Sequence, residues 1–81
     1  MKVSELWAMT TYGGKVQIED AKELNSISNP IVRFEEGISD MVYNEENEYH
    51  YLADKEVKYF DFMFNTLRII LKETKNEKDS I

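Results

Sequence analysis

The chain has 81 residues, 42% of them hydrophobic, with a formal net charge of −6 at pH 7 and no cysteine. This length corresponds to one small domain that can bury roughly 60–65% of the surface of its unfolded chain, and the absence of cysteine excludes disulfides, thiolate metal sites and thiol nucleophiles. The acidic balance opposes direct binding to nucleic acid or to an anionic membrane, because both require Lys or Arg to neutralise phosphates.

The first predicted element is a short amphipathic helix over residues 2 to 10, since Val3, Leu6 and Trp7 recur at the i, i+3, i+4 spacing of one helix face. A helix of this length is not stable alone, so its apolar side must lie on another element. We expect the Gly13-Gly14 pair to end the helix by adopting a positive φ.

A half-buried strand is predicted over residues 15 to 20, KVQIED, in which Val16 and Ile18 point inward and the polar residues between them point outward. Trp7 is expected to hold the preceding helix against the sheet that this strand joins. In the alternative interpretation, Trp7 and Tyr12 leave an aromatic face uncovered as a contact surface.

Residues 21 to 30 are mostly polar and end in Pro30, which predicts a loop or wide turn. The run IVRFEE, residues 31 to 36, is β-branched and aromatic and predicts a second strand, antiparallel to the first, that Gly37 terminates. Ser39 or Asp40 is expected to cap a short helical turn that follows.

Residues 54 to 73 fit two structures. Val57, Phe60, Phe64, Leu67 and Leu71 recur at helical spacing, with Asp54 available as the N-cap. The same segment also alternates as two strands on either side of Asn65-Thr66, and its aromatic residues favour a half-buried strand surface over a helix wall. We favour the β-hairpin.

The predicted fold is therefore α+β: a short N-terminal helix packed on a small, mainly antiparallel sheet of about four strands. Residues 1 to 73 are expected to form a single domain, and residues 74 to 81 a frayed polar tail. A sheet of this size has two edges, so self-association into a homo-oligomer is a further expectation.

Several short stretches resemble small accessory proteins of phages and mobile elements of Gram-positive bacteria. They are KVSEL in the first helix, KVQIED, FEEGISD, and the entry into the hairpin at Leu52 and residues 54 to 57, so that the resemblance runs over most of residues 2 to 73. It implies a phage-associated, cytoplasmic protein and supports the hairpin, but it transfers no functional residues.

The N-terminal sequence MKVSELW lacks the features of a secretory signal, and no apolar stretch approaches the roughly 20 residues that span a bilayer. We expect the protein in the cytoplasm, that of the host cell if it is phage-encoded.

An acidic window over residues 34 to 54 holds seven carboxylates and neither Lys nor Arg, whereas the rest of the chain has nine acids and ten bases. The ordinary interpretation is a solvated connection that keeps the protein soluble. The sharper hypothesis is a carboxylate array with tyrosine anchors that binds a basic partner. Its predicted contact residues are Glu35, Glu36, Asp40, Tyr43, Glu45, Glu46, Glu48, Tyr49 and Tyr51.

Catalytic, metal and cofactor sites are not predicted. The single histidine, His50, lies between two tyrosines, and no serine stands in a nucleophile elbow that could use it as a base. The acidic run does not match the ligand spacing of a calcium loop. We therefore expect a protein that is not an enzyme and needs neither metal nor cofactor.

The function expected from these features is non-catalytic binding to a protein with a basic surface, such as an enzyme that acts on nucleic acid. Spaced carboxylates can replace phosphates electrostatically, and small acidic phage inhibitors, including many anti-CRISPR proteins, act as nucleic-acid mimics in this way. The alternative is an assembly protein that functions through oligomerisation, with its acidity serving only solubility.

Overall fold

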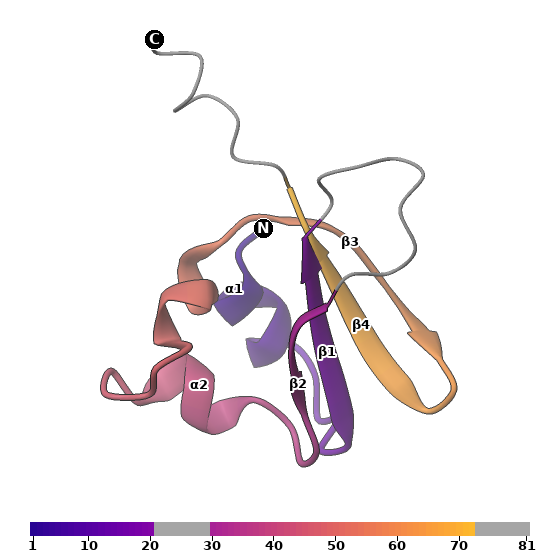
Figure 1. Ribbon diagram of the computed structural model, residues 1–81, viewed down its shortest axis with the longest axis horizontal. Coiled ribbons are helices and arrows are strands. Elements are labelled where there is room, and N and C mark those ends of the chain that lie inside the picture. Colours follow the sequence, from indigo (N-terminus) through magenta and orange to yellow (C-terminus); the bar gives the residue numbers. More distant parts are fainter. Residues whose placement is uncertain (21–29, 73–81) are drawn as a thin grey trace, which may run out of the picture.

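Figure 1 shows the computed structural model of the chain, which describes residues 1–20 and 30–72. Its elements in chain order are α1 Val3–Ala8, β1 Lys15–Asp20, β2 Pro30–Phe34, α2 Ser39–Tyr43, the 3-10 helix η1 His50–Asp54, β3 Val57–Met63 and β4 Thr66–Leu71. They form a compact α+β fold, as predicted. Most of the predicted loop over residues 21 to 30, and the predicted tail over 74 to 81, lie outside the described residues.

The four strands form one mixed sheet in the order β2-β1-β4-β3. The outer pairs, β1 with β2 and β3 with β4, are antiparallel, whereas the central pair of β1 and β4 is parallel. After β2 the chain passes through α2 and η1 to the opposite edge of the sheet, where β3 begins (Figure 1). The strands at the two edges are therefore β2 and β3.

The segment that fitted either a helix or a hairpin is a β-hairpin. Phe64 and Asn65 connect the strands with φ values of 55° and 61°, the pair of positive angles that a two-residue type I′ turn requires. The turn lies one residue earlier than the predicted break at Asn65-Thr66. Aromatic residues in β3 and β-branched residues in β4 suit a pleated surface, which explains why strand geometry prevails over the helical spacing.

The predicted end of the first helix is wrong in its mechanism. α1 ends at Ala8, its C-cap Met9 keeps right-handed helical geometry with φ −95° and ψ 0°, and neither Gly13 nor Gly14 has a positive φ. At the other end of α1, the Glu5 carboxylate accepts the backbone N–H of Lys2 at 2.7 Å, which satisfies a donor that the helix leaves unpaired. The C-terminal end of α1 therefore forms without a left-handed residue.

The core lies between the helices and one face of the sheet. Ile18 and Ile69 from the central strands, Met41 from α2 and Leu52 from η1 are almost fully buried there. Burial of such side chains contributes about 1.5–3 kcal/mol each, so this cluster holds the short helices in place. None of the described helices is long and apolar enough to cross a membrane.

Trp7 is buried in the core cluster, but its hydrogen bond ties α1 to α2, whereas we expected it to hold α1 against the sheet. Its side chain is 7% exposed, and its indole Nε1 donates a hydrogen bond to Ser39 Oγ at 3.0 Å. Ser39 is thus used by Trp7, and the prediction that Ser39 or Asp40 caps the following helix is wrong. The N-cap of α2 is Ile38, without a side-chain capping bond.

Candidate functional site

The predicted acidic contact residues lie between the end of β2 and the start of η1. These six carboxylates are all exposed: Glu35, Glu36, Asp40, Glu45, Glu46 and Glu48. Within residues 1–20 and 30–72, none of these six forms an ion pair, whereas Glu19, Asp54, Glu56 and Asp61 do. Their negative charge is therefore directed to solvent rather than neutralised by the described Lys and Arg residues.

Two asparagines order the connection between α2 and η1. Asn44 Oδ1 accepts the backbone N–H of Glu46 at 3.0 Å, and Asn47 Oδ1 accepts that of Tyr49 at 2.8 Å. Both are side-chain turns of the kind that asparagine stabilises in loops. The backbone N–H of Asn47 also bonds the Asn44 carbonyl at 3.0 Å. The glutamates between these residues consequently project from a defined backbone.

Two of the predicted contact residues have structural roles. The two oxygens of Asp40 accept hydrogen bonds from Asn44 Nδ2 at 3.2 Å and Asn47 Nδ2 at 2.7 Å, so this carboxylate holds the loop. Tyr49 packs edge-on against Phe34, with ring centroids 5.9 Å apart, and borders the core. By contrast, Tyr43 and Tyr51 are 65% and 56% exposed and are free to contact a partner.

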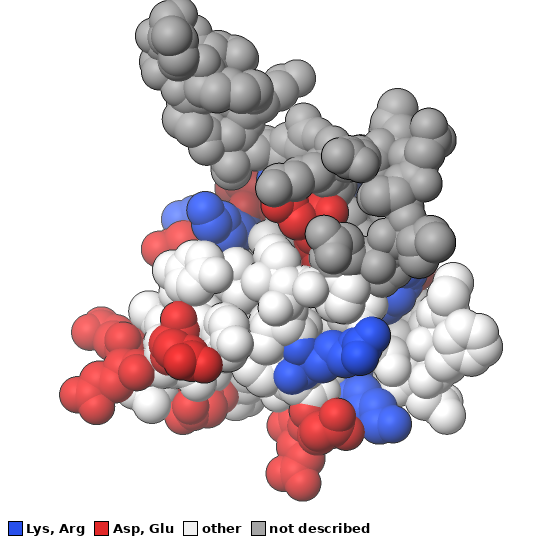
Figure 2. All heavy atoms as spheres, viewed as in Figure 1, with Lys and Arg blue, Asp and Glu red and all other residues white. Residues whose placement is uncertain are grey.

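The predicted contact set does not form one continuous array. In Figure 2 the acidic side chains gather over the connection between α2 and η1, and a separate acidic group lies at the end of β2 beside basic side chains. Glu35 and Glu36 directly follow β2, whereas Glu45, Glu46 and Glu48 belong to the ordered connection. Of the predicted carboxylates, only Glu45, Glu46 and Glu48 therefore lie on the connection between Tyr43 and Tyr51.

His50 has a structural contact. Its Nδ1 lies 2.9 Å from the carbonyl oxygen of Met41, which links the start of η1 to α2. When Nδ1 is protonated, it donates a hydrogen bond to this oxygen, which fixes the orientation of the ring. In the described part of the chain, no group of three or more His, Asp or Glu side chains is placed to hold a metal ion.

A polar network on the other face of the sheet was missed by the sequence analysis. Gln17 and Glu19 point away from the core as predicted, but they are buried rather than solvated, at 9% and 5% exposure. Arg33 Nε donates to Gln17 Oε1 at 2.7 Å, and Gln17 Nε2 donates to Glu19 Oε2 at 2.5 Å. Arg68 then links Glu19 at 3.3 Å to Asp61.

The pair of Asp61 and Arg68 is the strongest part of this network. Arg68 Nε and a terminal nitrogen donate to the two Asp61 oxygens at 2.8 and 2.7 Å, a bidentate geometry. The hydrogen bonds from Arg68 lower the pKa of Asp61 below its ordinary value, against a smaller opposing effect of burial. Because these residues come from all four strands, the network fixes strand register. The sequence carried one signal of this network: the strands β2 and β4 each contain a single arginine among mostly apolar residues.

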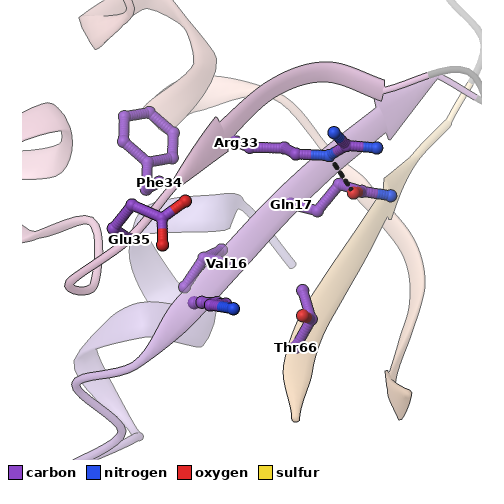
Figure 3. A pocket seen from close by; sticks show the side chains of 7 residues that line it. Val16, Gln17, Arg33, Phe34, Glu35 and Thr66 are labelled. Atoms are coloured by element: carbon purple, nitrogen blue, oxygen red, sulfur yellow. Dashed lines mark hydrogen bonds between the residues drawn. The ribbon is translucent and has the colours of Figure 1, made fainter. Parts of the chain in front are cut away.

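A hollow of about 330 Å³ opens on this face between β2 and β4. Figure 3 shows Arg33 reaching from β2 to Gln17 on β1, while Phe34 points away from that pair. Lys15 and Thr66 also line the hollow, together with Glu35. The cations Lys15 and Arg33 and the carboxylate of Glu35 all line the hollow, so it has no single sign of charge that would select a ligand.

Comparisons with known proteins give no identity for the chain. No family model, curated protein or solved structure matches it. The resemblance to phage accessory proteins therefore stays a prediction.

Proposed function

We propose that this protein is a non-catalytic binding protein that recognises a basic macromolecular surface through its acidic loop, defined as Tyr43, Glu45, Glu46, Glu48 and Tyr51. The observation that carries the proposal is the set of exposed glutamates, unpaired within the described residues, on a connection that hydrogen bonds order. Ordered charges lose little conformational freedom on binding, which favours affinity.

Charge and aromatic area act together in such a surface. Clustered carboxylates create a negative potential that accelerates encounter with a basic partner, with an effect that falls as salt screens it. Exposed tyrosines supply contact area with few rotatable bonds. Tyr43 and Tyr51 lie in α2 and η1, the two elements that flank the glutamates.

The proposed mechanism is occupation of a surface that otherwise binds phosphates. A partner of this kind is an enzyme that acts on nucleic acid, and the setting would be a phage or mobile element whose product inhibits a host enzyme in the anti-CRISPR manner. Such an inhibitor needs no catalytic group, because it acts by excluding the substrate. Its affinity should fall steeply with ionic strength, as binding of the nucleic acid itself does.

The test compares matched double variants in a pull-down from nuclease-treated bacterial lysate. Glu45→Lys with Glu46→Lys reverses two charges in the acidic loop, and Glu35→Lys with Glu36→Lys reverses two at the end of β2. We expect the wild type and the second variant to retain a basic protein that the first variant loses, and that added salt or duplex DNA releases. Equal retention by all three proteins, or retention that neither salt nor DNA affects, contradicts the proposal.

The alternative function, an assembly protein whose acidity serves solubility, is favoured by a different observation. The edge strand β3 carries exposed aromatic side chains on both of its faces. Strand-edge assembly should respond little to ionic strength, so salt dependence separates the two functions.

A further inference from the structure

The edge strand β3 and the turn that follows it expose five large apolar side chains within residues 59 to 64. Tyr59, Phe60, Phe62, Met63 and Phe64 are 49%, 48%, 59%, 44% and 90% exposed. Natural edge strands are usually protected by charge, proline or a covering segment, because unpaired edges associate with other chains. Here the edge strand is among the most aromatic segments of the sequence.

The helices do not reach this part of the sheet. Phe60 and Phe62 stand opposite Ile69 and Leu67 of β4, so they lie on the face that the helices cover elsewhere. In Figure 1, α1 and α2 are at the left and the tip of the hairpin projects at the lower right. Tyr12 packs edge-on against Phe62, with centroids 5.1 Å apart, yet more than half of Phe62 stays exposed.

The beginning of β3 is protected, which limits the free edge to its later residues. Lys2 forms an isolated antiparallel bridge with Glu56, and the Val57 N–H donates to the Met1 carbonyl at 2.8 Å. From residue 58 onward, no strand in the described part of the chain pairs with the outer side of β3. The charge of Asp61 is compensated by Arg68, and Lys58 forms no ion pair with any residue of the ranges 1–20 and 30–72.

The turn adds a second observation. Phe64 is held at φ 55°, a left-handed conformation that costs a residue other than glycine roughly 1–2 kcal/mol. Such conformations are concentrated at functional sites, and this one places an aromatic ring almost entirely in solvent. The ring gains little from its own fold in return.

We propose that β3 pairs with β3 of a second copy of this chain, antiparallel and about a two-fold axis, to give a continuous eight-stranded sheet. The five exposed side chains offer about 600 Å² per copy if a free side chain presents about 200 Å². Both copies together then bury at most about 1,200 Å², the lower end of the range for specific interfaces. The dimer is accordingly expected to dissociate in the micromolar range.

Charge distribution also fits a second copy. A chain with a net charge of −6 repels itself, but the acidic groups visible in Figure 2 lie at the left, below and at the upper centre, and the flank at the right, where the β3–β4 hairpin lies, is mostly white. A perpendicular two-fold axis keeps each face of the sheet continuous, so Phe60 and Phe62 of one copy meet the same face of the other.

Sedimentation velocity over a range of protein concentrations tests the dimer. We expect the wild type to shift from monomer to dimer, and Phe60→Lys to raise the dissociation constant at least about tenfold because it places a charge in the new interface. Ile31→Lys is the matched control, because Ile31 is 37% exposed on the other edge strand, β2. It should dimerise like the wild type.

Hydrogen exchange of the wild type provides a measurement that does not depend on a variant folding. Amides of residues 58 to 63 should gain protection as concentration rises, while those of β2 should not. A wild type that stays monomeric throughout, including one that pairs only with a different protein, overturns the proposal. It is also overturned if Phe60→Lys leaves the dimer intact, or if Ile31→Lys is the variant that disrupts it.

Discussion

Replacing Phe64 by asparagine should stabilise the monomer. Phe64 adopts a φ of 55° at the first central position of the hairpin turn, where asparagine and glycine are preferred. Asparagine tolerates the left-handed region, so Phe64→Asn should recover about 1 kcal/mol of the strain there. The substitution removes a ring that is 90% exposed, so the loss of burial is small.

The loss of the small buried part of the Phe64 ring opposes this gain, and its size follows from the exposure of the ring. The buried tenth of a ring of about 200 Å² is about 20 Å², which at about 25 cal/mol per Å² is worth about 0.5 kcal/mol. The net gain in free energy of unfolding is about 0.5 kcal/mol. For a domain of this size, such a gain raises the melting temperature by about 2–4 °C.

Urea unfolding followed by circular dichroism at low protein concentration is the appropriate assay, because a dimer would add a concentration-dependent contribution. Asn65→Val is the control: Asn65 has a φ of 61°, and a β-branched residue there should lower stability by about 1–2 kcal/mol. If Phe64→Asn is destabilising, or Asn65→Val is neutral, the reasoning from positive φ is refuted. The turn would then have a different backbone.

Two further predictions concern the fold and the polar network. Gly37→Ala should destabilise the protein by about 2 kcal/mol in thermal unfolding, because Gly37 has a φ of 78° and a new Cβ would lie 3.1 Å from the Trp7 ring. Gly13→Ala, where a Cβ meets nothing within 4 Å, should be neutral or slightly stabilising. Asp61→Asn should lower stability at pH 7 by about 0.5–1 kcal/mol, a value reduced for solvent screening because this carboxylate is 38% exposed. Its lowered pKa means that the stabilisation by Arg68 is present above the ordinary Asp pKa and is lost as pH falls through the folded-state value, so urea titrations of variant and wild type should converge in acid. A constant difference at every pH would contradict this linkage.

Much of the architecture could be predicted from local patterns. The strand over residues 15 to 20 was identified with its bounds, because apolar and polar residues alternate there without interruption. The hairpin was identified because its aromatic residues fit a strand better than a helix. The 3-10 helix at His50–Asp54 was not predicted, since its formation depends on burial of Leu52 and Ala53 against other elements rather than on periodicity.

The interactions across the sheet could not be predicted, for a topological reason. β1 and β4 are about 50 residues apart in sequence, and their parallel pairing is what brings Arg68 to Glu19. Alternation shows that Glu19 points away from the core, but it does not show which strand lies beside it. The acidic window illustrates the same limit: its charge was evident, whereas the separation of Glu35 and Glu36 from the loop required the fold.

The two proposed surfaces lie on different flanks of the molecule, and this separation gives the proposals independent physical tests. The acidic loop depends on charge, so ionic strength should govern its binding. The β3 edge depends on backbone pairing and apolar burial, so protein concentration should govern it. A dimer through β3 would hold two acidic loops in one particle, and a partner with repeated basic sites would then be bound more tightly than either loop allows alone. Self-association could thus strengthen the acidic interface without contributing a residue to it.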